Sequence, residues 1–356
     1  AAFLGEENAA SLCRAEMQSN IVSEGPLDTP ILQYDSGVIA AKLDRTEKEL
    51  VHKVSFHISS GESLTLIGET GSGKTLIAQS IMGVLPGNVS LVSGEISFCG
   101  NTLPKGKKLR SMLGREIVYI PQNGHEFLDP SRSIRRQMFD SIAKLGIAAP
   151  QRYAFACEKL AQVGFTQPEA ILEQYPFQLS GGMAQRVTIA LALCSEAKLL
   201  IADEPTTALD VTIQAQVLEL MKKLKAEYRM SMIMITHDLG VVAEVCDKVA
   251  VLYAGNIVEY GAMEDVFDDP RHPYTRALFD ATPTLDGEKH KLNIIKGFSP
   301  DPIHLPEGCA FHPRCKEVCD KCSAVMPEMV EVAPGHLVRC VHAVPCGAEK
   351  TEEVAE

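Results

Sequence analysis

The sequence predicts an α/β domain followed by a small cysteine-rich domain, and three observations predict this arrangement. From Ile31 to about Ala262, short apolar segments alternate with longer amphipathic stretches, which is typical of parallel strands connected by helices. A glycine-rich loop separates one apolar segment from a predicted helix. From Pro270 to His342 the chain is rich in Pro, His and Cys and shows little long periodicity, which favours a loop-rich second domain.

The secondary structure of the first domain follows from its apolar pattern. A β-hairpin is predicted where two apolar segments flank Ala254 and Gly255. Helices are predicted from about Lys74 and after Ser180, and the region from about 130 to 179 is predicted to be helical. Pro150 and Pro168 mark breaks in that region. The predicted strands are 64–67, 117–120, 199–202, 232–235, 249–253 and 256–259.

The composition excludes several classes of protein. The chain has 356 residues, of which 46% are hydrophobic, so it can fill a packed core. A formal net charge of -12 disfavours non-specific binding to the phosphates of nucleic acids. No apolar run approaches the ~18 residues of a membrane span. We expect no secretory leader at the start of the sequence, and its eleven cysteines then favour metal binding or free thiols over disulfides.

A glycine-rich loop directly follows the predicted strand 64–67. Its sequence is Gly68-Glu69-Thr70-Gly71-Ser72-Gly73-Lys74-Thr75, which fits the pattern G-x-x-x-x-G-K-[ST]. Glycines let backbone amides converge on an anion, and the start of the following helix adds positive potential. Lys74 can reach the β- and γ-phosphates of a nucleotide, and the Thr75 hydroxyl can bind Mg²⁺. The alternative, a turn with a surface lysine, fits this strand–loop–helix context poorly.

Polar side chains follow three other predicted strands. Asp203 and Glu204 end the strand 199–202, and buried carboxylates are costly unless they bind a cation or hydrogen-bond donors. Asp203 is suited to Mg²⁺, and Glu204 is suited to orienting or deprotonating an attacking water. Gln122 follows the strand 117–120 and can reach Mg²⁺ or that water. His237 follows the strand 232–235 and can contact the γ-phosphate.

A second anion-binding helix start is predicted at Ser180-Gly181-Gly182. Ser180 is a good N-terminal cap, and the two glycines expose the first amides of the helix. The chain has only one phosphate loop, so we expect this helix start to complete a nucleotide site on another subunit. An ordinary capped helix is the alternative for this segment alone.

Together and in this order, these segments resemble the nucleotide-binding subunits of ATP-binding-cassette transporters, over Ile31 to about Gly261. The resemblance implies a RecA-like core with a β-subdomain and an inserted helical subdomain. It also implies a glutamine loop at Gln122, a signature at Ser180–Gly182, an interface loop at Ala208-Leu209-Asp210 and a switch histidine, His237. Two cassettes then sandwich two ATP molecules and drive membrane-embedded subunits. The implied catalytic residues are Glu204, His237 and Gln122. The implied nucleotide contacts are Gly68, Glu69, Thr70, Gly71, Ser72, Gly73, Lys74, Thr75, Ser180, Gly181, Gly182 and Asp210. The implied Mg²⁺ ligands are Thr75, Gln122 and Asp203.

The expected domain organisation follows from the composition and the resemblance together. The expected units are an N-terminal extension 1–30, an ATPase domain 31–265 with a helical subdomain at about 124–185, a C-terminal domain 266–345 and an acidic tail 346–356.

Three further runs resemble the oligopeptide and dipeptide permease branch of this family, which also contains nickel and metallophore importers. They are 202–216, 271–278 and 308–315. The resemblance implies an ATPase at the cytoplasmic face of the cell (inner) membrane, attached peripherally to two transmembrane permease subunits. The other implied partners are a second ATPase chain, identical or paralogous, and an extracytoplasmic substrate-binding protein that acts indirectly. Import of peptide is the leading function, and import of nickel or a metal chelate is the alternative. A soluble cassette ATPase acting on nucleic acid or ribosomes is a further alternative, which the acidic charge disfavours.

Four cysteines of the second domain have the spacing x5, x6 and x17: Cys309, Cys315, Cys322 and Cys340. A segment this short and loop-rich needs a stabilising cross-link or metal group. Four thiolates can bind either Zn²⁺ or an iron–sulfur cluster. The pair Cys319–Cys322 is typical of zinc sites. The resemblance favours a four-iron four-sulfur cluster on the first-named four, with Cys319 and Cys346 as extra thiols.

Two departures from the family pattern concern nucleotide binding. The family places an aromatic ring upstream of the phosphate loop to stack on adenine, but no Phe, Tyr or Trp lies between Gly37 and Lys53. Tyr34 lies early for this role, and we expect Phe56 in a core strand. Ala184 also stands where relatives often carry a polar or basic residue, and we expect a modest effect because the three signature residues are intact.

Overall fold

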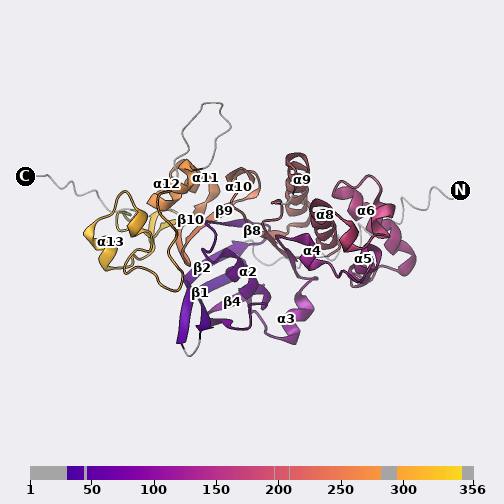
Figure 1. Cartoon of the computed structure of the whole chain (residues 1–356), viewed down its shortest axis with the longest axis horizontal. Coiled ribbons are helices and arrows are strands. Elements are labelled where there is room, and N and C mark those ends of the chain that lie inside the picture. The colour runs from indigo at the N-terminus through magenta and orange to yellow at the C-terminus, as the bar shows by residue number, and fades with distance from the viewer. Residues whose placement is uncertain (1–29, 44–45, 196, 208, 282–294, 347–356) are drawn as a thin grey trace, which may run out of the picture.

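The structure is a computed structural model, which describes residues 30–43, 46–195, 197–207, 209–281 and 295–346 (Figure 1). The predicted extension 1–30, except Pro30, and the predicted acidic tail, except Cys346, lie outside the described residues. So does Ala208 of the predicted interface loop. Among the described residues, no helix has the length and apolar character needed to cross a membrane.

An eight-stranded sheet forms the centre of the molecule. Its strand order is β11-β12-β10-β9-β3-β8-β7-β6. The neighbours β9, β3, β8, β7 and β6 run parallel, whereas β10 pairs antiparallel with β9. The predicted strands and the predicted hairpin are therefore confirmed. The bounds are β3 (Ser63–Ile67), β6 (Ile117–Ile120), β7 (Leu199–Asp203), β8 (Ser231–Ile235), β9 (Lys248–Tyr253) and β10 (Asn256–Ala262).

Both faces of the parallel strands are buried, because successive side chains point into two different cores. In β8, Met232 and Met234 face one core while Ile233 and Ile235 face the other. Every residue of β3, β7 and β8 is buried. Strands covered on both faces read as continuous apolar runs, which is why the sequence marks them clearly.

A second sheet of four antiparallel strands has the order β2-β1-β4-β5. Its residues are β1 (Pro30–Leu43), β2 (Thr46–Ser59), β4 (Val89–Phe98) and β5 (Asn101–Thr102). The rings of Tyr34 in β1 and Phe56 in β2 stack with centroids 5.1 Å apart, and the Tyr34 hydroxyl is hydrogen bonded to Ser80. This sheet and the neighbouring face of the main sheet share one core.

Helices α5, α6 and α8 gather at one end of the molecule (Figure 1). Pro150 and Pro168 lie in the first turns of their helices, so each marks a helix start. The helices that follow the sheet strands are α2 (Lys74–Met82), α3 (Lys107–Met112), α4 (Gly124–Phe127), α9 (Val211–Tyr228) and α10 (Leu239–Val245). The helical region contains α5 (Ile134–Ala143), η1 (Ala149–Gln151), α6 (Arg152–Gln162), α7 (Pro168–Leu172), η2 (Pro176–Gln178) and α8 (Gly181–Ala192).

The C-terminal region is joined to the main sheet. Strand β12 pairs antiparallel with β10, and β11 extends the sheet by one more strand. His336 of β12 lies 2.8 Å from Glu259 of β10, and both side chains are buried. The expected boundary near 265 lies in α11, and the strands on either side of it, β10 and β12, belong to the same sheet. The elements are α11 (Met263–Asp268), α12 (Pro273–Asp280), η3 (His312–Arg314), α13 (Asp320–Ala324), β11 (Val330–Ala333) and β12 (His336–Val338).

Candidate functional site

The glycine-rich loop 68–75 connects β3 to α2 as predicted, and its glycines are required by close contacts. Gly68 has φ +148°, and a Cβ there would lie 2.1 Å from the Leu252 carbonyl oxygen. Gly73 has φ 101° and comes directly before α2, so an L side chain there would be strained. Thr70 and Gly71 are exposed at the tip of the loop. The loop therefore offers its backbone to a ligand.

Lys74 lies across this loop. Its Nζ donates to the carbonyl oxygens of Gly68 and Glu69 at 2.8 and 2.9 Å, and to Ser72 Oγ at 3.3 Å. Burial lowers the pKa of Lys74, and the nearby carboxylates of Glu204 and Asp203 act in the opposite direction. The ammonium group is thus held at the loop, where an anion bound to the loop amides would meet it.

Asp203 ends β7 next to the first turn of α2. Its carboxylate is hydrogen bonded to Thr75 and accepts from the Tyr119 hydroxyl at 3.3 Å. Asp203 is buried, and burial raises the pKa of its carboxyl group. A buried carboxylate beside a threonine hydroxyl is a donor set that suits Mg²⁺, because hard cations prefer oxygen ligands. The residues present therefore fit the ion that the sequence predicts.

Three polar side chains contact the Glu204 carboxylate at the end of β7. Gln122 Nε2 donates to its Oε2 at 2.7 Å, and the Thr207 hydroxyl donates to the same oxygen at 3.1 Å. His237 Nδ1 lies 3.1 Å from Oε1. Glu204 has φ 45°, a left-handed conformation that is uncommon for a residue with a side chain. The three residues predicted to be catalytic, Gln122, Glu204 and His237, are therefore in direct contact.

The predicted signature lies at the start of α8. Ser180 caps this helix, and its hydroxyl accepts from the Met183 amide at 3.3 Å. Gly181 is exposed, with open space where a Cβ would point. Gly182 is half-buried. Over the described parts of the chain, no hydrogen bond or ion pair joins these three residues to the phosphate loop.

Helix α8 packs tightly against the segment that follows Gln122. A Cβ at Gly124 would lie 2.6 Å from the Gln185 amide nitrogen and 2.7 Å from the Ala184 carbonyl carbon. Gln185 Nε2 also donates to the Pro121 carbonyl oxygen at 2.9 Å. Ala184 is fully buried in this contact, which explains a small apolar residue where the family pattern suggested a polar one. Two of the predicted functional loops are thus fixed to each other.

Asp210 is the N-terminal cap of α9, where its carboxylate accepts from the Ile213 amide at 3.1 Å. This position places it at the start of a helix that follows the Glu204 segment. No described contact joins Asp210 to the phosphate loop.

Neither aromatic residue considered for adenine stacking is free to do so. Tyr34 is fully buried and Phe56 nearly so, and the two rings stack on each other. At the end of the phosphate loop, a Cβ on Gly73 would lie 3.0 Å from Val51 Cγ2 and 3.8 Å from the Leu50 carbonyl oxygen of β2.

The C-terminal region contacts the phosphate loop, which the sequence did not predict. Arg314 donates from Nη1 and Nη2 to the two carboxylate oxygens of Glu69, at 2.6 and 3.0 Å. The Glu69 amide donates to the Tyr274 hydroxyl at 2.9 Å. Arg314 and Glu69 are far apart in the sequence, and no local pattern links them.

The cysteines of the C-terminal region form one neighbourhood of free thiols. Burial is the main cause that raises the pKa of Cys315, Cys322 and Cys340, and the Cys309 thiol raises each of them further. The Cys309 amide also donates to the Cys322 carbonyl oxygen at 2.8 Å. The thiol of Cys309 therefore acts electrostatically on the other three thiols that the sequence spacing selected. Thiols that share a partly buried site fit a bound metal group, since a metal stabilises the thiolate form.

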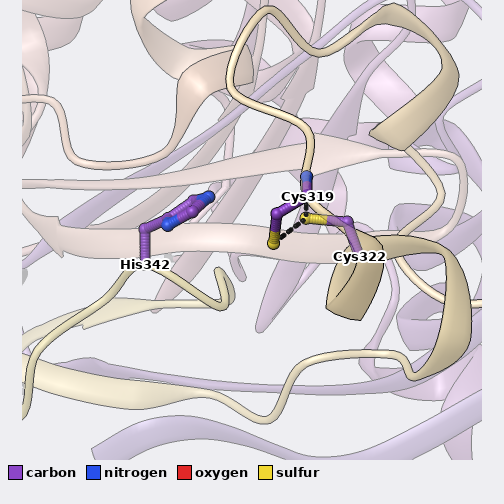
Figure 2. Close-up of side chains that lie close together, drawn as sticks. All are labelled: Cys319, Cys322 and His342. Carbon is purple, nitrogen blue, oxygen red and sulfur yellow. Dashed lines mark hydrogen bonds between the residues drawn. The ribbon is translucent and has the colours of Figure 1, made fainter.

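A second set of ligand atoms overlaps with this one. Cys319, Cys322 and His342 offer atoms that all lie within 4.8 Å of one another (Figure 2). The sulfurs of Cys319 and Cys322 are 3.5 Å apart, and the first turn of α13 holds them. His342 Nε2 lies 2.9 Å from the Glu317 carbonyl oxygen, which leaves Nδ1 as its possible metal ligand. Cys319 is a thiol extra to the cluster that the resemblance implies, and no spacing pattern in the sequence marks His342. Cys322 belongs to both sets.

Two family models match the chain. The model described as "ABC transporter" matches residues 51–207, and the model described as "Oligopeptide/dipeptide transporter, C-terminal region" matches residues 258–322. The first covers the phosphate loop, Gln122, the signature and Glu204. The second covers Arg314 and three of the clustered cysteines.

Similar proteins match over nearly their whole length. The chain is 44% identical over 311 residues to the oligopeptide transport ATP-binding protein AppD of Bacillus subtilis, covering 85% of this chain and 93% of that protein. It is 40% identical over 295 residues to the dipeptide transport ATP-binding protein DppD of Escherichia coli, covering 82% and 90%. A solved dimeric ATP-binding cassette with ADP and Pi has the same fold, with a TM-score of 0.59 and 23% identity, over 65% of this chain and 98% of that one.

Proposed function

The chain belongs to the oligopeptide and dipeptide transport ATP-binding proteins of the ABC transporter family, and from this premise we propose that it hydrolyses ATP to drive import of di- and oligopeptides. The observation that carries the proposal is the contact of Glu204 with Gln122 and His237, beside the phosphate loop. A carboxylate held by an amide and an imidazole is arranged to act on water at a bound phosphate.

Each side chain then has one role in hydrolysis. The amides of the phosphate loop and Lys74 hold the β- and γ-phosphates, and Lys74 exchanges its present carbonyl partners for phosphate oxygens. Bound Mg²⁺ would neutralise phosphate charge, with Thr75 and Asp203 as its closest protein groups and Gln122 near it. Glu204 orients and deprotonates the attacking water, and His237 contacts the γ-phosphate from the neighbouring strand.

The nucleotide site needs a second chain. The signature Ser180–Gly182 presents its helix start on α8, and none of its described contacts reaches the phosphate loop of its own chain. A helix start with free amides attracts phosphate. Each ATP therefore lies between one chain's phosphate loop and the signature of a second ATPase chain, identical or paralogous. A dimeric relative of the same fold supports this arrangement.

The remaining partners are two transmembrane permease subunits, with an extracytoplasmic substrate-binding protein acting through them. The chain attaches peripherally at the cytoplasmic face of the inner membrane. Peptide is proposed as the cargo because both compared relatives are named for oligopeptide or dipeptide transport. Nickel or a metal chelate remains the alternative cargo, since the cargo is selected by the partner proteins.

The test uses the complete complex in sealed vesicles. Labelled dipeptide and tripeptide, and in parallel labelled nickel, are offered with the binding protein, with and without internal ATP. We expect ATP-dependent peptide accumulation and no nickel uptake. Nickel uptake without peptide uptake would overturn the assignment of cargo, and ATP hydrolysis that no cargo stimulates would overturn the assignment to import.

For the cysteine site, we propose a four-iron four-sulfur cluster on Cys309, Cys315, Cys322 and Cys340. The spacing of these four cysteines in the sequence supports it, together with the electrostatic influence of Cys309 on Cys315 and Cys340, because four thiolates in one neighbourhood can hold such a cluster. A single Zn²⁺ on Cys319, Cys322 and His342 is the alternative that their close spacing favours.

Two substitutions separate these alternatives. With the cluster, anaerobically purified protein is brown, Cys315→Ser removes the colour and Cys319→Ser keeps it. With zinc, the protein is colourless, Cys319→Ser loses the metal and Cys315→Ser keeps it. Iron, sulfide and zinc are measured by elemental analysis in each variant.

A further inference from the structure

The ion pair between Arg314 and Glu69 connects the C-terminal region to the nucleotide site. Glu69 is the second residue of the phosphate loop, and Arg314 is the last residue of η3. The guanidinium group meets both carboxylate oxygens, at 2.6 and 3.0 Å. This two-pronged geometry is the strongest form of the arginine–carboxylate contact and fixes both groups in direction.

The surroundings of Arg314 hold it in this one position. Its side chain is only 6% exposed. Nη1 also lies 3.2 Å from the Tyr253 hydroxyl, and Nε donates to the Lys296 carbonyl oxygen at 3.0 Å. The guanidinium group is therefore nearly removed from water and is bonded on several sides. Removing one partner of such a pair leaves the other charge without compensation.

A cluster of aromatic rings also contacts Glu69. Tyr253, Tyr274 and Phe311 pack ring against ring, with centroids 4.6 to 5.3 Å apart. The Tyr274 hydroxyl accepts a hydrogen bond from the backbone amide of Glu69. Glu69 is thus held through its main chain by Tyr274 and through its side chain by Arg314.

Two of the clustered thiols flank the segment that carries Phe311 and Arg314. Cys309 comes two residues before Phe311, and Cys315 comes directly after Arg314. A group bound by both thiols would fix both ends of this short segment. The position of the guanidinium group then depends on whether the cysteine site is intact.

We propose that Arg314 is a positioning residue of the nucleotide site, which neutralises Glu69 and sets the phosphate loop for ATP, and that the anchors Cys309 and Cys315 control this through the segment between them. The inference rests on the proposed binding of ATP at the phosphate loop. Without Arg314, the Glu69 carboxylate is an unpaired negative charge beside the phosphate site, so it opposes the binding of a polyanion.

The first experiment measures the affinity of the full chain for ATP and ADP without hydrolysis, by titration calorimetry. Arg314→Met should weaken both affinities at least fivefold, a typical coupling between sites. Arg135→Met is the matched control, because it breaks an exposed ion pair in the helical region. In that pair, Arg135 Nη1 lies 2.8 Å from Glu173 Oε1. It should leave affinity unchanged. Equal affinities of Arg314→Met and wild type would overturn the inference.

Rescue separates positioning from simple loss of structure. Adding Glu69→Gln to Arg314→Met removes the unpaired charge, so the double variant should recover part of the lost affinity. Thermal unfolding is followed in every variant. If the double variant binds no better than Arg314→Met, the charge argument is wrong.

The anchors are tested in a double-mutant cycle. Cys309→Ser with Cys315→Ser should weaken ATP affinity in the wild-type background and have no added effect in the Arg314→Met background. Additive effects would show that the cysteines act on nucleotide by another route and would overturn this part. The wild-type protein tests the proposed function separately: if it binds no ATP, that function fails, whereas normal binding in all variants defeats only the present inference.

Discussion

Glu204 and His237 are in hydrogen-bond contact, with 3.1 Å between Oε1 and Nδ1, although 32 residues separate them in the chain. They follow neighbouring parallel strands, β7 and β8, and the Glu204 amide donates to the Ile235 carbonyl oxygen at 2.8 Å. The contact is therefore fixed by strand pairing, and Glu204 itself has a left-handed backbone conformation with φ 45°.

Replacing Glu204 by Gln should nearly abolish hydrolysis and leave ATP binding intact. The amide keeps the size of the side chain but cannot take a proton from water, which costs on the order of 10²-fold or more. Phosphate release by the assembled complex and equilibrium ATP binding check this. Glu173→Gln, an exposed carboxylate on the helical region, is the control. A rate near that of wild type would contradict the role of Glu204.

The isolated chain should hydrolyse ATP only slowly. In the proposed arrangement, the phosphate loop and the signature of one chain serve different sites, so a second ATPase chain completes each one. Turnover per chain should rise with protein concentration or on addition of the partner ATPase. Fast turnover that does not depend on concentration, from a chain shown to be monomeric by light scattering, would refute the composite site.

ATP and GTP should bind with similar affinity. Tyr34 and Phe56 are buried in the core, so no ring among them can stack on adenine. Loss of an aromatic stack forfeits ~0.5–1.5 kcal/mol of base-dependent binding. Competition between the two nucleotides for the full complex measures the ratio. A preference for ATP above about tenfold, which corresponds to ~1.4 kcal/mol, would mean that another residue recognises adenine.

Acid should destabilise the protein through His272. Burial is the main cause that lowers the pKa of His272 from 6.5 to about 4, so the folded chain holds this ring neutral. Between those two values the unfolded chain binds the extra proton, and the free energy of unfolding falls by roughly 1.4 kcal/mol for each pH unit lowered. Above pH 6.5 the effect is absent.

The test replaces His272 by Asn. His272 Nδ1 accepts a hydrogen bond from the Tyr274 amide at the start of α12. The side-chain oxygen of an Asn can accept the same hydrogen bond and cap the helix. Urea unfolding at several pH values should show a weaker pH dependence for His272→Asn between pH 6.5 and 4. An unchanged slope would show that His272 does not cause the acid sensitivity.

Gly124→Ala should destabilise the protein by about 1–3 kcal/mol, because its Cβ would overlap the backbone of α8. The nearest atoms are backbone atoms, at 2.6 to 2.8 Å, and cannot move independently. Gly87→Ala is the control, since a Cβ there meets no atom within 4 Å. Chemical unfolding compares the two. Equal stabilities would mean that α8 and α4 separate at no cost.

The sequence predicted those parts of the site that lie at the ends of buried strands. Gln122, Asp203, Glu204 and His237 each follow a short apolar run, and parallel strands bring their ends to one edge of a sheet. Periodicity marks such strands, and order along the chain then places the side chains. This reasoning was sufficient to bring Glu204 and its partners together.

The four-stranded sheet could not be placed strand by strand. The resemblance implied a β-subdomain, but β1 and β2 contain several register shifts, which interrupt the alternation of apolar and polar residues. Half of the residues of β4 are exposed, and the apolar Val92 is one of them. Without a regular period, these strands give no local signal.

The contact between Arg314 and Glu69 could not be predicted because nothing local specifies it. Arg314 lies in a proline- and cysteine-rich run, where its neighbours suggested metal binding. Only the three-dimensional path of the C-terminal region brings it back to the phosphate loop. The same is true of His342, which reaches Cys322 from beyond the last strand.

The pairing of β12 with β10 has a consequence for the order of events during synthesis. Strand β10 leaves the ribosome well before β12, so its edge stays open until the end of the chain is made. An open edge is a template for pairing with other chains. The carboxylate of Glu259 is fully buried in the finished protein, and it lacks its contact with His336 until β12 has been made. A chain cut near residue 265 would keep both defects permanently, so it should aggregate where the full-length protein stays dispersed.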